Sequence, residues 1–282
     1  MEFTRRGYNL NVMLNRSAAP DSHHAGGLLK KWRERRKLSQ LDLSCESGIS
    51  TRHLSFLETG RSSPSRSMLL RLCENLDLPL RERNRLFVAA GYAPVYPERP
   101  LEHSSLDSAR RAMDKLLVGL EPNPALVIDR HWTLISSNQA VPPLLEGAAR
   151  WLVQPPVNVI RLSLHPEGIA PRIVNLHEWR PHLLERLRRQ IESSGDPVLL
   201  DLLKEVQEYP EPTPRRRISV DQDAALVPLR LAFGDSVLSF LSTTMLFGTP
   251  LDITLSELAI EMFFPTDVIT TEMLKELALG DR

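Results

Sequence analysis

Apolar positions recur at helical spacing from Leu28 onward, and glycine, serine or proline interrupts the pattern about every ten residues. Five segments show this: LLKKWRERRKL, SQLDLSCESG, STRHLSFLETG, SRSMLLRLCENLDL and PLRERNRLFVAAG. Ser39 and Ser50 stand where a hydroxyl caps a helix, and Gly48 allows a tight turn between the second and third segments. The pattern predicts five short helices in the first third of the chain.

The third of these segments has one apolar stripe and one polar face. Leu54 and Leu57 are three residues apart and are expected to be buried, with Ile49 packed at the helix entry. This leaves Thr51, Arg52, Ser55 and Phe56 on the outer face. Such a face suits the DNA major groove, where arginine can pair with guanine and an apolar group can touch the thymine methyl. Taken one at a time, these residues have simpler explanations. Polar residues on an exposed helix are ordinarily only solvated, and Phe56 could pack against a neighbouring helix.

The spacing across the second and third segments is more informative than any one residue. Leu43, a small residue at 44, Gly48, Ile49 and Leu54 together form the skeleton of a helix-turn-helix. We therefore expect a DNA-binding domain over residues 25–92.

The remaining two thirds mix helical and strand patterns. An apolar stripe predicts a helix over residues 105–120, which extends a connector or pairs with its copy in a dimer. Alternation predicts two short strands around residues 129–131, a hairpin turning at Gly234 and Asp235, and a last strand ended by Pro265. Two helices broken at Gly195 and Pro197 lie between them. The order is that of an α+β domain.

Length and charge fit two domains of different roles. The chain has 282 residues and no net charge, but residues 25–99 carry 14 Lys and Arg against 8 Asp and Glu, and residues 100–282 carry 18 against 25. This asymmetry suggests that the first part meets a polyanion. Two cysteines, Cys45 and Cys73, and no apolar run near the about 18 residues of a membrane span predict a reduced, cytoplasmic protein.

The stretch from LSQLDLSCESGISTRHLSFLETG to GYAPVY resembles the phage-repressor-like, Xre-type helix-turn-helix domain, in the subfamily whose second half is an MmyB-like ligand-binding domain. The resemblance covers nearly the whole chain after the tail. It implies an all-α, five-helix domain of the lambda-repressor type followed by a PAS-like α+β domain. The expected organisation is a tail over 1–24, the DNA-binding domain over 25–92, a linker and connecting helix over 93–120, and the ligand-binding domain over 121–282.

The resemblance also implies residue roles on the DNA side. Gln40 is expected to hold the backbone of the DNA and Arg61 to approach a phosphate. Ser44 departs from the alanine that the motif prefers, but serine is small enough for the helix crossing. The expected DNA-binding residues are Ser39, Gln40, Ser50, Thr51, Arg52, His53, Ser55, Phe56 and Arg61.

On the ligand side, the resemblance implies a small apolar effector, such as a fatty acid like myristate or palmitate. We expect no required cofactor. Inward strand and helix positions are expected to line its cavity, although the same positions also describe an ordinary core. Arg172 and Asn175 are the candidate anchors for a carboxylate. The expected lining is Leu126, Ile128, Trp179, Leu183, Leu187, Leu229, Leu231, Leu238, Phe240, Leu258, Ile260 and Met262.

Catalytic and metal-binding patterns are weak in this sequence. His177 and His182 are five apart around Pro181, whereas a zinc-protease helix needs a spacing of four. Asp221 and Asp223 are typical of a solvated turn, and scattered histidines, which could ligate a haem, are more often ordinary surface or core residues. We therefore expect no enzyme and no metal site. Two functions stay open: a ligand-responsive, homodimeric regulator of a double-stranded DNA operator, or a constitutive DNA-binding or antitoxin-like module whose second half only dimerises or binds a protein.

Overall fold

The computed structural model describes residues 24–210 and 226–280. The expected tail up to residue 23 and the pair Asp221 and Asp223 lie outside these ranges. The main boundary between two compact units falls between Val95 and Tyr96. Each unit is described by itself below.

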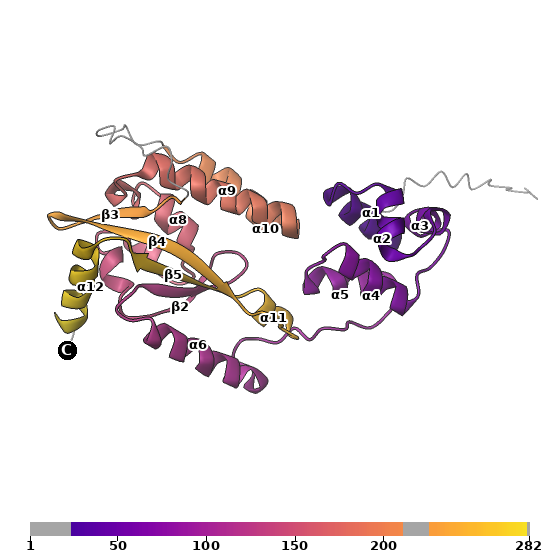
Figure 1. Cartoon of the computed structure of the whole chain (residues 1–282), viewed down its shortest axis with the longest axis horizontal. Helices are drawn as coiled ribbons and strands as arrows, with labels where there is room; N and C mark the ends of the chain where they lie inside the picture. Colours follow the sequence, from indigo (N-terminus) through magenta and orange to yellow (C-terminus); the bar gives the residue numbers. More distant parts are fainter. Residues whose placement is uncertain (1–23, 211–225, 281–282) are drawn as a thin grey trace, which may run out of the picture. The chain divides into compact units, whose positions relative to one another are not determined.

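The first unit contains the five predicted helices (Figure 1). They are α1 (Ala25–Arg35), α2 (Gln40–Ser47), α3 (Thr51–Glu58), α4 (Arg66–Asn75) and α5 (Leu80–Ala89). Their apolar stripes meet in one core, in which Leu43, Leu54, Leu57, Leu69 and Phe87 are almost completely buried. The prediction of an all-α domain is confirmed.

The connection between α2 and α3 is built as the sequence predicts. Ser39 caps α2, and its hydroxyl accepts a hydrogen bond from the amide of Asp42 while the Asp42 carboxylate accepts from the Ser39 amide. Gly48 ends α2 with a φ of 64°, a left-handed conformation that favours glycine. Ser50 caps α3 through the amide of His53. Two capped helices are thus joined by a three-residue turn.

The second unit is built on one antiparallel sheet with the strand order β2-β1-β5-β4-β3 (Figure 1). Its strands are β1 (Ala125–Ile128), β2 (Leu134–Ser137), β3 (Leu229–Phe233), β4 (Ser236–Leu246) and β5 (Ala259–Pro265). The β3–β4 hairpin turns at Gly234 and Asp235, as predicted. This is the expected multidomain architecture, a helical domain followed by an α+β domain.

Helices cover both faces of this sheet. On one face lie α8 (Val159–Leu164), α9 (Leu176–Ser194) and α10 (Pro197–Gln207), which form the larger core together with residues of the strands. On the other face α6 (Asp107–Gly119) packs Met113 and Leu117 against Val127 and Ile260. The helix expected in a connector over 93–120 is therefore part of the sheet domain, because its apolar stripe is buried there.

Several short elements and one longer helix were not predicted. They are η1 (Ser104–Leu106), η2 (Pro142–Leu145), α7 (Arg150–Val153), α8 (Val159–Leu164), η3 (Ala170–Arg172), α11 (Ile253–Ser256) and α12 (Val268–Gly280). Most have too few residues to show a helical period. The longer one, α12, contacts β4 and β5.

Candidate DNA interface and ligand cavity

The outer face of α3 presents the side chains expected to contact DNA. Thr51 and Arg52 are exposed, and Ser55 and Phe56 are half-buried. The Arg52 guanidinium lies 5.5 Å from the centre of the Phe56 ring, so the aromatic face supports the cation without neutralising it. Leu54, Leu57 and Ile49 are buried on the opposite side, as predicted. The helix therefore has one face for the core and one available to a groove.

The remaining expected DNA-binding residues, apart from Gln40, fall into three groups. Ser39 and Ser50 act as helix caps. His53 lies 3.4 Å from the Ser62 hydroxyl. Arg61 is exposed directly after α3, and its amide donates to the Phe56 carbonyl at 2.8 Å.

Gln40 has a structural partner in addition to any contact with DNA. Its side-chain amide donates to Glu58 at 2.8 Å. Glu58 also receives two hydrogen bonds from Arg33, and this contact, despite the opposing effect of burial, raises the pKa of the Arg33 guanidinium. The burial of Arg33 and Glu58 does not follow from the hydrophobic pattern, since charged residues are normally assigned to the surface.

A cavity that is partly open to solvent lies between the sheet and the helices of its α9 face. Its walls are mostly leucine, isoleucine, valine and aromatic side chains, as in typical small-molecule sites. Six of the predicted residues line it: Leu126, Trp179, Leu183, Leu229, Leu231 and Phe240. Other lining residues were not predicted from the sequence, among them Trp132, Leu144, Ile160, Ile169, Arg186, Glu261 and Phe263.

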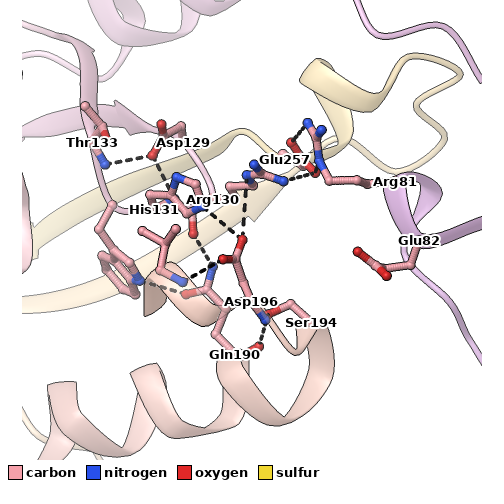
Figure 2. Close-up of polar contacts among 12 residues, drawn as sticks. Arg81, Glu82, Asp129, Arg130, His131, Thr133, Gln190, Ser194, Asp196 and Glu257 are labelled. Atoms are coloured by element: carbon pink, nitrogen blue, oxygen red, sulfur yellow. Dashed lines mark hydrogen bonds and ion pairs between the residues drawn. The ribbon is translucent and has the colours of Figure 1, made fainter. Parts of the chain in front are cut away.

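Trp132 is placed in the cavity wall by the turn between β1 and β2. The Asp129 carboxylate accepts hydrogen bonds from the amides of His131 and Thr133, each at 2.8 Å, which closes the turn (Figure 2). Trp132 has a φ of 66°, an uncommon conformation for a bulky residue, and its indole N–H donates to Gln190 at 2.7 Å. Gln190 donates in turn to the Arg130 carbonyl at 2.7 Å. These contacts fix the ring between the turn and α9.

Part of the cavity lining is polar. Arg186 of α9 donates to both carboxylate oxygens of Glu261 on β5, at 2.6 and 3.2 Å. Thr244 of β4 accepts from Arg186 at 3.0 Å and donates to Glu261 at 2.8 Å. The Arg186 guanidinium also lies 4.9 Å from the centre of the Trp132 ring. The site thus combines a long apolar wall with one compensated ion pair.

Two family matches cover both domains. Residues 109–277 match the MmyB-like transcription regulator ligand binding domain, and residues 29–83 match a helix-turn-helix family. This chain belongs to the MmyB-like transcription regulators.

Curated relatives of this MmyB-like regulator carry a consistent description. Uncharacterized HTH-type transcriptional regulators of Mycobacterium bovis and Mycobacterium tuberculosis are 39% identical to it over 111 residues. The alignment spans 38% of this chain and 38% of each relative. The family is one of transcription regulators rather than enzymes.

Two groups of predicted lining residues are not in the cavity wall of the MmyB-like domain. Leu258, Ile260 and Met262 pack on the α6 face, because in β5 the cavity side is taken by the alternate residues Glu261 and Phe263. Three further residues belong to the core around the cavity without lining it: Ile128, Leu187 and Leu238.

Neither predicted carboxylate anchor reaches the cavity. The Arg172 guanidinium donates to the carbonyls of Ala232, Leu144 and Glu146. The buried Asn175 side chain donates to the Pro228 carbonyl and to Glu178 and accepts from the Arg230 amide. Both side chains hold the backbone of the domain, so their polar groups serve its fold.

Within residues 24–210 and 226–280, no group of three or more His, Cys, Asp and Glu side chains is arranged to hold a metal ion. No helix of these ranges is long and apolar enough to span a bilayer.

Proposed function

We propose that this protein is a sequence-specific DNA-binding regulator whose affinity for its operator changes when an elongated apolar ligand occupies the cavity of the second domain. The observation that carries the proposal is the presence, in one chain, of an exposed Arg52 face on α3 and an apolar cavity between sheet and helices. A ligand regulates only if it binds the DNA-competent and incompetent states unequally.

The proposed ligand is a fatty acid of myristate or palmitate length, or a derivative that keeps its acyl chain. The cavity wall has two charged residues, and most of its other side chains are apolar, which suits an alkyl chain with one polar end. Each buried methylene contributes about 0.8 kcal/mol, so a long chain gains enough to stay bound during purification. The strand order β2-β1-β5-β4-β3, with the cavity between the sheet and its covering helices, supports a PAS-like sensor.

The proposed DNA-bound form is a homodimer on a double-stranded operator. A single α3 contacts few base pairs, and related domains read two half-sites about 34 Å apart by pairing two recognition helices. Light scattering of the full chain should give a dimer, and footprinting should give a palindromic site. A monomer at high micromolar concentration with a non-palindromic footprint would contradict this part.

Organic extraction and mass spectrometry of the purified chain test whether a lipid is bound. Because Trp132 and Trp179 line the cavity, adding myristate or myristyl alcohol to stripped protein should change tryptophan emission. Filling the cavity by Phe240→Trp is the matched variant, and it should weaken this response. If the purified protein contains no lipid and its tryptophan emission changes with neither compound, the result would favour a constitutive DNA-binding module.

A further inference from the structure

The ion pair in the cavity lining has its charges balanced within the protein. The Glu261 side chain is only 4% exposed, and its carboxylate receives hydrogen bonds from Arg186 and Thr244. Of the described residues that line the cavity, Arg186 and Glu261 alone carry a full charge. The cavity lining therefore has no net charge that would attract an ionic ligand.

The pair lies where the head group of an acyl ligand would be. Thr244, which bonds to the pair, is exposed and the Arg186 side chain is 25% exposed, whereas the lining residues Leu231 and Phe240 are almost completely buried. An alkyl chain gains by occupying the apolar interior. Its polar end is then left beside Arg186 and Glu261.

The ionised carboxylate of a fatty acid at this place would lie beside a second carboxylate, that of Glu261. Two carboxylates in one site repel each other, and ionisation of one of them becomes unfavourable. A hydroxyl, ester or amide oxygen has no such penalty. A guanidinium has five N–H donors, and the contacts to Glu261 and Thr244 account for three of them, so Arg186 can also donate to a neutral oxygen.

We propose that Glu261 makes the cavity selective for acyl ligands with an uncharged, oxygen-bearing head group, and that Arg186 donates to that oxygen. The proposal rests on the proposed apolar-ligand function and specifies its ligand class. In it Glu261 acts as a selectivity residue, because it keeps Arg186 from recruiting an anion.

The test is a comparison of myristate, myristyl alcohol and methyl myristate, each titrated below its micelle concentration into the stripped full chain at neutral pH. The alcohol and the ester should bind at least about tenfold more tightly than myristate to the unmodified protein. Glu261→Gln leaves Arg186 uncompensated, so it should raise the affinity for myristate by about tenfold or more and leave the alcohol within about threefold.

The double variant Arg186→Gln with Glu261→Gln is the matched control. It has no cation, so it should gain nothing for myristate, and without the Arg186 guanidinium as donor it should bind the alcohol more weakly than the unmodified protein does. Myristate binding as tightly as the alcohol to the unmodified protein would overturn the selectivity, whether or not the variants fold. Failure of all three compounds to bind would instead overturn the proposed function, and the selectivity with it.

Discussion

The guanidinium of Arg33 in α1 and the carboxylate of Glu58 at the end of α3 are joined by two hydrogen bonds, 2.7 Å from Nε to Oε1 and 2.9 Å from Nη2 to Oε2. Their side chains are 9% and 1% exposed. Glu58 also accepts from Gln40 at the start of α2. One carboxylate therefore holds the three helices that set the orientation of the proposed DNA-reading face.

Removing this carboxylate should strongly destabilise the helical domain. Glu58→Ala leaves the buried Arg33 charge without a partner, and we expect a loss of about 3–5 kcal/mol in the free energy of unfolding. Denaturant unfolding of the full chain, followed by circular dichroism, measures it. The double variant Arg33→Met with Glu58→Leu removes both charges and should lose much less. Similar losses in the two proteins would show that the charge is not what matters.

Arg52 should contribute to sequence discrimination on DNA. If its guanidinium pairs with guanine, Arg52→Ala should cost about 1–3 kcal/mol on a site selected from random DNA and much less on unselected DNA. Arg52→Lys keeps the charge but not the planar fork, so it should also lose discrimination. Equal losses on both kinds of DNA would remove Arg52 from the base-reading residues.

Arg61 should act through a phosphate. Arg61→Ala is expected to weaken binding to all sequences alike and to reduce the slope of log K against log salt by about one. Fluorescence anisotropy at several salt concentrations gives this slope. An unchanged slope would mean that Arg61 is not close to the backbone of the DNA.

His182 of α9 should make stability depend on pH. Its ring stacks on Trp179, with centroids 5.4 Å apart, and burial, followed by the positive charges of Arg186 and Arg189, lowers its pKa, with Glu261 acting in the opposite direction. The unfolded chain, in which the histidine pKa is about 6.5, then binds the proton more readily than the folded one. The stability contributed by neutral His182 is therefore lost as the pH falls from the histidine pKa of the unfolded chain towards the lower pKa of His182 in the folded protein.

The comparison of the unmodified protein with His182→Gln isolates this effect. The free energy of unfolding of the unmodified protein should fall more steeply between about pH 7 and pH 5 than that of the variant. Parallel pH profiles of the two proteins would contradict the assignment.

The sequence was most informative where local chemistry decides the structure. Ser39, Gly48 and Ser50 act within a few residues of themselves, so the caps and the turn between α2 and α3 were predicted correctly. The β3–β4 hairpin likewise follows from a turn whose two strands are adjacent in the chain.

The cavity was harder to predict because both faces of the sheet are covered. Leu258, just before β5, and Ile260 and Met262 within it alternate as expected, but alternation does not say which of the two covered faces they contact. The register Leu126↔Glu261 places Glu261 on the cavity face, and this pairing joins segments far apart in the chain. An acidic residue in such a strand is naturally assigned to solvent, so its pairing with Arg186 was not foreseen.

The most direct test of ligand-controlled DNA binding is a DNA titration of the stripped full chain, with and without saturating myristyl alcohol or myristate, on a site selected from random sequence. Saturation is followed by the emission of Trp132 and Trp179. We predict a change of at least about fivefold in the Kd for DNA, and by linkage the same factor in the Kd for the ligand when DNA is present. A ligand that saturates the cavity while the Kd for DNA stays the same would contradict the account.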